Sequence, residues 1–289
     1  MTIRLTRPAR AALALARRDG QHCVLVSVLY IEGSAPREAG AAMLITPRHV
    51  HGTIGGGHLE LKSVAIAREL LQAGLSASDA GSVTRRFPLG PALGQCCGGV
   101  AHIRFDVCAA GMVPPALQVQ APANLFELRL FGAGHVGQAL VNVLAEVDCD
   151  ITWVDSREQQ FPAHVPANAR IEFSEAPQEE VAAASPGAFY LVMTHSHALD
   201  LAIVERIFER GDAGLVGLIG SHTKRITFER RLRGKGFADS AIESLVCPIG
   251  MPGVAGKAPG VVAIAVAAQL LAQAGMQCAA MRAGTKATA

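Results

Sequence analysis

The chain has 289 residues, of which 50% are hydrophobic and 17% charged, and its formal net charge is +2. This composition is typical of a folded protein and excludes a disordered one. A net charge so close to balance gives no indication of a nucleic acid or an anionic membrane as a partner. The length fits two domains, each with its own core.

The cysteines and the apolar segments indicate in which cellular compartment the protein is expected. Seven cysteines follow neither a disulfide framework nor a CxxC spacing, and their odd number fits a reducing compartment. The apolar run at residues 11–16 is too short for a signal peptide. The most apolar stretch, residues 261–271, falls short of the roughly 20 residues that a transmembrane helix needs. We therefore expect a cytoplasmic protein with no membrane partner.

The first 112 residues predict a mixed α+β domain. A helix is expected up to about Arg18, because the following Asp19 and Gly20 suit a helix end. The β-branched, apolar run at residues 23–31 indicates a buried strand. Further strands are expected at residues 42–46, 52–54, 83–87 and 100–108, and a second helix from residue 57.

Two glycine-rich loops in this half are candidate binding loops. Residues 33–40 are turn-forming residues that include one arginine, Arg37. The run Gly55, Gly56 and Gly57 opens the second helix, where backbone N–H groups and the helix dipole favour an anion such as phosphate. The alternative is a tight turn that needs positive φ angles. No Walker pattern is present, so a nucleoside triphosphate is not indicated.

A double cysteine within residues 94–99 is the most distinctive stretch of the chain. Neighbouring side chains on an extended backbone point to opposite faces, so we expect no disulfide between the two thiols. The flanking glycines would let a ligand approach the backbone and reach a sulfur. The alternative is that the cysteines pack as small hydrophobic residues at the start of a strand. The candidate ligand-binding residues here are Gln95, Cys96, Cys97 and Gly98.

Residues 113–124 are predicted to be a linker, because they contain Pro114, Pro115 and Pro122 and show no periodicity. They would separate a domain of residues 1–112 from a second domain of residues 125–289. Beyond the linker, strands and helices alternate, which is the signature of a parallel sheet.

The second domain is predicted to be a Rossmann-like, doubly wound parallel sheet. A strand at residues 125–131, a G-x-G-x-x-G turn, a helix and a second strand ending at Asp155 match the dinucleotide-binding pattern. Asp155 would accept hydrogen bonds from ribose hydroxyls, and the nearby Arg157 leaves the choice between NAD and NADP open. The fold alone does not establish that a dinucleotide binds. The candidate cofactor-binding residues are Gly132, Gly134, His135, Gly137 and Asp155.

Two later loops are also of interest. His195 and His197 could share a face and bind a metal, but a third ligand at matching spacing is missing, so a hydrogen-bonded crevice loop with Asp200 is favoured. A further glycine-to-helix start at residues 220–225 carries Lys224 and Arg225, which would suit a phosphate.

Together these motifs resemble the XdhC/CoxI type of xanthine dehydrogenase accessory proteins over nearly the whole chain. The motifs that carry this resemblance are residues 33–37, 55–60, 94–99, 131–136, 194–200, 219–224 and 248–250. One departure is that Pro259 is followed by Gly260, Val261 and Val262, where the resemblance leads us to expect a carboxylate.

The resemblance implies a chaperone rather than an enzyme. Such a protein would bind the sulfurated molybdenum cofactor, protect it and insert it into apo-xanthine dehydrogenase. It would also contact a cysteine desulfurase and other molybdenum cofactor biosynthesis proteins, and a homodimer is expected. Cys96 or Cys97 would contact the metal or its sulfur, since soft thiolates suit such a centre. The alternatives are an NAD(P)-dependent oxidoreductase, and a Rossmann domain that serves only for docking and dimerisation.

Overall fold

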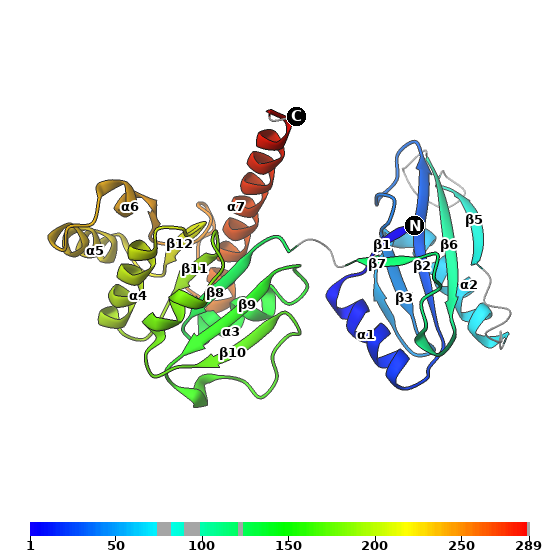
Figure 1. The fold of residues 1–289 in the computed structure, drawn as a ribbon, viewed down its shortest axis with the longest axis horizontal. Coiled ribbons are helices and arrows are strands. Elements are labelled where there is room, and N and C mark those ends of the chain that lie inside the picture. Colours follow the sequence, from blue (N-terminus) through cyan, green and yellow to red (C-terminus); the bar gives the residue numbers. More distant parts are fainter. Residues whose placement is uncertain (74–81, 90–98, 121–123, 288–289) are drawn as a thin grey trace. The chain divides into compact units, whose positions relative to one another are not determined.

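The computed structural model describes residues 1–73, 82–89, 99–120 and 124–287, and the chain divides into two compact units, Met1–Ala123 and Asn124–Ala289 (Figure 1). The predicted site residues Gln95, Cys96, Cys97 and Gly98 lie outside the described residues. The predicted fold class is confirmed: a mixed α+β unit is followed by a Rossmann-like unit.

The N-terminal unit is built on an antiparallel five-stranded sheet with the order β4-β3-β2-β6-β5. Its strands are β2 (Cys23–Glu32), β3 (Ala42–Ile45), β4 (Val50–Gly52), β5 (Ser82–Pro88) and β6 (Val100–Cys108). The other elements are β1 (Thr2–Arg4), α1 (Arg7–Arg18), α2 (Gly57–Gln72), the 3-10 helix η2 (Ala109–Gly111) and β7 (Gln118–Gln120).

Alternation along β2 divides the side chains between two cores. Val24, Val26 and Val28 pack in the core beneath α2, whereas Cys23 and Leu25 pack in the core beneath α1. The helices α1 and α2 therefore cover opposite faces of this sheet, as Figure 1 shows.

The linker predicted at residues 113–124 was too long. Residues 118–120 form β7, which pairs in parallel with β1, and the Met1 amine donates a hydrogen bond to the Ala116 carbonyl. The N-terminal unit thus extends beyond residue 112. The segment Gln118-Val119-Gln120 is short and mostly polar, and its partner strand lies more than a hundred residues earlier, so no local pattern indicates the pairing.

The C-terminal unit is a six-stranded parallel sheet with the order β10-β9-β8-β11-β12-β13. In chain order this is 3-2-1-4-5-6, the doubly wound arrangement of dinucleotide-binding domains. The strands are β8 (Glu127–Phe131), β9 (Asp150–Asp155), β10 (Ala169–Phe173), β11 (Phe189–Val192), β12 (Leu215–Leu218) and β13 (Leu245–Val246). The helices are α3 (His135–Val143), η3 (Glu158–Gln160), η4 (Pro177–Ala183), α4 (His197–Arg210), α5 (His222–Gly234), α6 (Asp239–Ser244) and α7 (Pro259–Ala287).

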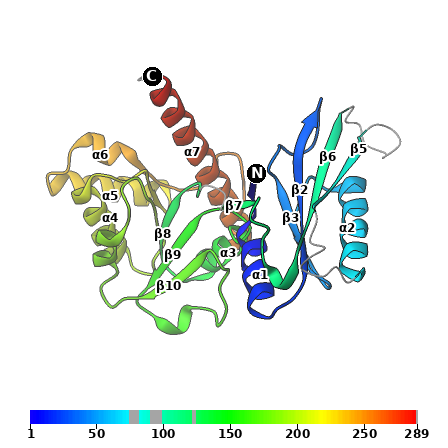
Figure 2. The same cartoon turned by 45° about the vertical axis from the view of Figure 1, so that its right-hand side comes forward.

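Helices cover both faces of the parallel sheet. Residues of α3 and α7, such as Leu140 and Val266, pack on one face, and residues of α4 and α5, such as Ile203 and Phe228, pack on the other (Figure 2). The strands β8, β9, β11 and β12 are buried on both faces and accordingly consist mainly of apolar residues, whereas the edge strand β10 is largely exposed.

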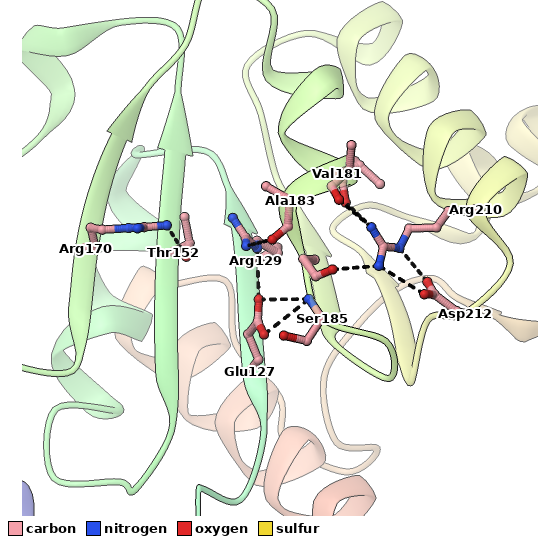
Figure 3. Close-up of polar contacts among 11 residues, drawn as sticks. Glu127, Arg129, Thr152, Arg170, Val181, Ala183, Ser185, Arg210 and Asp212 are labelled. Atoms are coloured by element: carbon pink, nitrogen blue, oxygen red, sulfur yellow. Dashed lines mark hydrogen bonds and ion pairs between the residues drawn. The ribbon is translucent and has the colours of Figure 1, made fainter.

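A polar cluster fixes the 3-10 helix η4 (Figure 3). The Arg210 guanidinium donates hydrogen bonds to the carbonyls of Val181, Ala182 and Ala184 and pairs with Asp212. Arg129 donates to the Ala183 carbonyl at 2.6 Å. Cations that bond the last carbonyls of a helix stabilise that helix end.

Helix α7 is longer than the apolar stretch at residues 261–271 suggested. By length and composition, Pro259–Ala279 could cross a membrane, and it is the one such helix among the described residues. A third of that stretch is buried inside the unit. Ala263, Val266 and Leu270 belong to the core next to α3, which accounts for part of the apolar composition.

Candidate functional site

Two of the predicted loops of the N-terminal unit meet at Gly99, the last residue of the double-cysteine motif. A Cβ placed on Gly99 would lie 2.3 Å from the Ser34 carbonyl oxygen and 2.7 Å from that of Glu32. The Leu89 N–H donates a 2.8 Å hydrogen bond to the Gly99 carbonyl, which joins the two residues that flank residues 90–98. Leu89 and Gly99 are therefore bonded to each other, and Gly99 lies against the start of the loop of residues 33–40.

The glycine turn before α2 contacts the same loop. A Cβ on Gly55 would lie 2.7 Å from Cγ of Pro36 and 3.4 Å from Cγ of Arg37. The Arg37 side chain is 39% exposed, and its nearest carboxylate is that of Glu38 at 3.7 Å. Gly99, the loop of residues 33–40 and the glycine turn are separated in sequence and are thus neighbours in this unit.

Two backbone N–H groups at the glycine turn, those of Ile54 and Gly56, already have an anionic partner. Oε2 of Glu60, in the first turn of α2, accepts hydrogen bonds from the Gly56 N–H at 3.1 Å, the Ile54 N–H at 3.2 Å and the Thr53 hydroxyl at 2.5 Å. Gly55, Gly56 and Gly57 all have positive φ, which accounts for the glycines as turn residues. A phosphate bound at this turn would have to displace Glu60.

A cluster of three polar side chains lies beside these loops and was not predicted. His102 Nε2 is 2.8 Å from Glu32 Oε1, and the imidazole stacks on the Tyr30 ring with centroids 4.0 Å apart. Tyr30 is 46% exposed. A bulge in β2 between Val28 and Tyr30 shifts the register, so that the apolar Val28 and the polar Tyr30 lie on opposite faces. Period-two alternation puts residues 28 and 30 on one face, and so it could not reveal the cluster.

In the C-terminal unit the three glycines of the G-x-G-x-x-G motif, two in the turn after β8 and one in α3, have different roles. A Cβ on Gly132, whose φ is +120°, would lie 2.3 Å from the Met193 carbonyl oxygen, and one on Gly137 would lie 2.3 Å from that of Gly132. A Cβ on Gly134 would meet nothing within 4 Å. The first glycine permits the turn, the last permits close packing of α3, and Gly134 leaves space where a ligand can approach the backbone. His135, at the start of α3, is exposed.

Asp155 is engaged within the protein. Its carboxylate accepts hydrogen bonds from the Ala133 N–H at 2.6 Å and the Arg157 N–H at 2.9 Å, and it pairs in a bidentate manner with the Arg157 guanidinium. Its side chain is only 3% exposed. Burial alone would raise the pKa of Asp155, but the hydrogen bonds from Arg157 and Ala133 outweigh it and hold that pKa below its ordinary value. Binding of a ribose to this carboxylate requires Arg157 to move.

A buried ion pair joins the first turns of α4 and α5, which follow β11 and β12. Lys224 Nζ lies 2.6 Å from Oδ2 of Asp200 and donates to the Ile219 carbonyl at 2.8 Å. The Thr194 N–H and hydroxyl donate to Oδ1 of the same aspartate. Lys224 is therefore used internally, and the suggestion that it binds a phosphate is not supported.

The histidines of this region form no metal site. His195 and His197 are exposed. Within the part of the chain that the structure describes, no group of three metal-ligating side chains exists.

Comparison with protein families gives two matches. Residues 16–86 match the XdhC and CoxI family, and residues 128–270 match the XdhC Rossmann domain. The two matches lie in the two compact units, and in the order that the motifs indicated.

Individual relatives cover most of the chain. The uncharacterized protein YqeB of Escherichia coli (strain K12) is 29% identical over 261 residues, which are 89% of this chain and 44% of YqeB. The chain thus spans less than half the length of this relative. A solved structure described as a xanthine dehydrogenase from Bacillus halodurans is 19% identical, with a TM-score of 0.67, and the match covers 91% of this chain and 94% of that one. This likeness concerns the fold of the chain.

Proposed function

The chain belongs to the XdhC and CoxI family, and from this premise we propose that it is an accessory protein in the maturation of a xanthine dehydrogenase. In this proposal it binds the sulfurated molybdenum cofactor and inserts it into the apo-enzyme, without catalysing a reaction of its own. The observation that carries the proposal is the contact of Gly99, the last residue of the double-cysteine motif, with the loop of residues 33–40, which in turn contacts Gly55.

Side chains of these motifs and of β2 would supply the chemistry that such a cargo needs. The thiolates of Cys96 and Cys97 are soft ligands for a molybdenum or sulfur centre. The half-exposed guanidinium of Arg37 is suited to the phosphate of the cofactor. We assign the phosphate to Arg37 because Glu60 already accepts the hydrogen bonds of the Ile54 and Gly56 N–H groups. The exposed Tyr30 ring offers an aromatic surface for the pterin.

The proposed partners are apo-xanthine dehydrogenase, a cysteine desulfurase that supplies the terminal sulfur, and other proteins of molybdenum cofactor biosynthesis. We propose a homodimer that acts in the cytoplasm. A carrier has to release its cargo, so moderate affinity for the cofactor is expected.

The thiols provide the direct test. The purified 289-residue chain is loaded with molybdenum cofactor, and the Cys96→Ala and Cys97→Ala variants are compared with wild type for molybdenum content and for activation of apo-xanthine dehydrogenase. The matched control is Cys278→Ala, which changes a partly exposed cysteine of α7. We expect at least one of the two variants to lose binding and delivery while the control keeps both. If both variants bind and deliver like wild type, the thiol role is wrong.

An NAD(P)-dependent oxidoreductase is the second candidate, favoured by the open Gly134 in a Rossmann turn. The internal pairing of Asp155 argues against it, because the ribose-binding carboxylate is already occupied. Titration with NAD(H) and NADP(H) distinguishes the two candidates. Binding accompanied by reduction of a substrate would favour the oxidoreductase, and no binding at millimolar concentration would remove it.

A further inference from the structure

A cavity of about 550 Å³ lies beyond the carboxyl ends of β12 and β13 in the C-terminal unit. Its walls come from the first turn of α3, the loop after β12, the loop of residues 248–257 and the start of α7, and they include Val136, Gly220, Met251, Lys257 and Val262. The volume is typical of a site for a small molecule. In an open parallel sheet, the crevice at the carboxyl ends of the strands is where ligands bind.

The cavity favours an anionic ligand with an apolar part. None of the described residues that line it is acidic. Lys257 is exposed and forms no ion pair with any described residue. The helices α3 and α7 both begin beside the cavity, at His135 and Pro259, so the positive ends of two helix dipoles lie near it. The side chains of Val136, Ile249 and Val262 supply an apolar wall.

The loop of residues 248–257 is held in place by α7. The Gly250 N–H donates a 2.7 Å hydrogen bond to the Gln269 side chain, and the Met251 N–H donates a 2.9 Å bond to the Ala265 carbonyl. The walls on this side are therefore anchored to a core helix, and the cavity is a preformed feature of the unit.

The opposite half of the crevice is closed to a second nucleoside. A dinucleotide in a Rossmann domain places one ribose at the acid that ends the second strand, here Asp155 of β9. That carboxylate is buried and paired with Arg157. A ligand that needs only the glycine turn and the cavity does not have to break this pair.

We propose that this cavity binds a phosphorylated heterocycle of mononucleotide size, with its phosphate near the start of α3 and Lys257 and its ring against the apolar wall. The Rossmann unit would thereby select mononucleotides over dinucleotides. This site lies in a different unit from the proposed thiol site and does not depend on it.

The chain carries its own reporter for this site. Trp153 is the one tryptophan of the sequence, and its indole N–H donates a 3.0 Å hydrogen bond to the Gly132 carbonyl in the glycine turn. Titration of the full chain with AMP, nicotinamide mononucleotide, NAD and inorganic phosphate, followed by tryptophan fluorescence and calorimetry, measures binding directly.

Two variants test the placement of the ligand. Lys257→Gln removes the cation, and a lost hydrogen bond to a charged group should weaken mononucleotide binding about tenfold or more. Gly134→Ala adds a methyl group that meets no protein atom within 4 Å, at a φ of −74° that alanine adopts readily. It should leave the melting temperature unchanged while it blocks the ligand. Gly234→Ala, in α5, is the matched control, since its added Cβ also meets nothing.

The expected result is binding of at least one mononucleotide that both Lys257→Gln and Gly134→Ala weaken and Gly234→Ala does not. Absence of mononucleotide binding up to about 5 mM would overturn the proposal, since affinity weaker than this is negligible. Binding that the two variants leave unchanged would overturn it as well. So would NAD binding that is a hundredfold tighter than binding of either mononucleotide. None of these results bears on the Cys96 and Cys97 variants, so the two proposals fail separately.

Discussion

Gly99 packs so closely against Ser34 that a Cβ on Gly99 would come within 2.3 Å of the Ser34 carbonyl oxygen. The distance to the Ser34 nitrogen would be 2.9 Å, so the obstacle is backbone and not a flexible side-chain end. This contact ties the end of the double-cysteine motif to the loop that carries Arg37.

The Gly99→Ala variant should be destabilised by about 1–3 kcal/mol, because the added methyl group forces two backbone segments apart. Chemical unfolding measures this change. The same variant should bind molybdenum cofactor more weakly than wild type, if the double-cysteine loop is part of the site. Gly234→Ala is the control and should be neutral or slightly stabilising, since its methyl group meets no atom. Equal stability of the two variants would contradict the packing argument.

The Lys224→Met variant should lose about 3–5 kcal/mol of unfolding free energy, because it leaves the fully buried Asp200 carboxylate without its cation. Urea unfolding followed by tryptophan fluorescence gives the value for the C-terminal unit. Lys235→Met is the matched control: its partner is Glu205 and its side chain is 55% exposed, so it should cost less than about 1 kcal/mol. A similar small loss in both variants would mean that the buried pair is dispensable.

The Asp155–Arg157 pair predicts a specific pH dependence. The pKa of Asp155 in the folded protein lies below its ordinary value. The pair therefore stabilises the folded state fully at pH values above about 4, where an unperturbed aspartate is ionised. This stabilisation is lost as the pH falls through the pKa that Asp155 has in the folded protein. In the Arg157→Gln variant, the guanidinium no longer offsets the burial of the Asp155 carboxylate, so the pKa of Asp155 in the folded protein rises.

The stability difference between wild type and Arg157→Gln should therefore increase from about pH 3 to about pH 6. Unfolding free energies measured in urea across this range, with Trp153 as the probe, provide the check. A difference that stays constant with pH would show that Asp155 is not the titrating partner.

The Tyr190→Phe variant should be at least as stable as wild type and up to about 1 kcal/mol more stable. The Tyr190 hydroxyl is buried and has no hydrogen-bond partner among the described residues, and burial raises the pKa of this tyrosine. Thermal and chemical unfolding measure the effect. The control is Tyr30→Phe, which changes a half-exposed tyrosine and should alter the unfolding free energy little. A clear loss of stability in Tyr190→Phe would mean that the hydroxyl has a partner in solution.

The Rossmann unit could be predicted from local signals. The strand, the glycine turn with Gly132, Gly134 and Gly137, the helix and Asp155 all fall within about 30 residues, and each signal depends on near neighbours in the chain. The mixture of helices and strands in the N-terminal unit was predictable for the same reason, since the apolar run of β2 and the helix signals around α1 and α2 are local.

The partners of the candidate site residues depended on the tertiary structure. The pairing of β1 with β7 shortened the linker, and the bulge in β2 placed Tyr30 next to His102. Three groups that the sequence analysis had assigned to a ligand are paired within the protein. The Gly56 N–H bonds Glu60, the Asp155 carboxylate pairs with Arg157, and the Lys224 ammonium pairs with Asp200.

Residue order and periodicity thus determined the longer helices and strands, the Rossmann pattern and the family, because backbone preferences and amphipathic patterns act over a few residues. Which polar groups are left to meet a ligand was decided by contacts between segments far apart in the chain. Such contacts are set by packing and by the need to pair buried charges, and no short stretch of sequence contains that information.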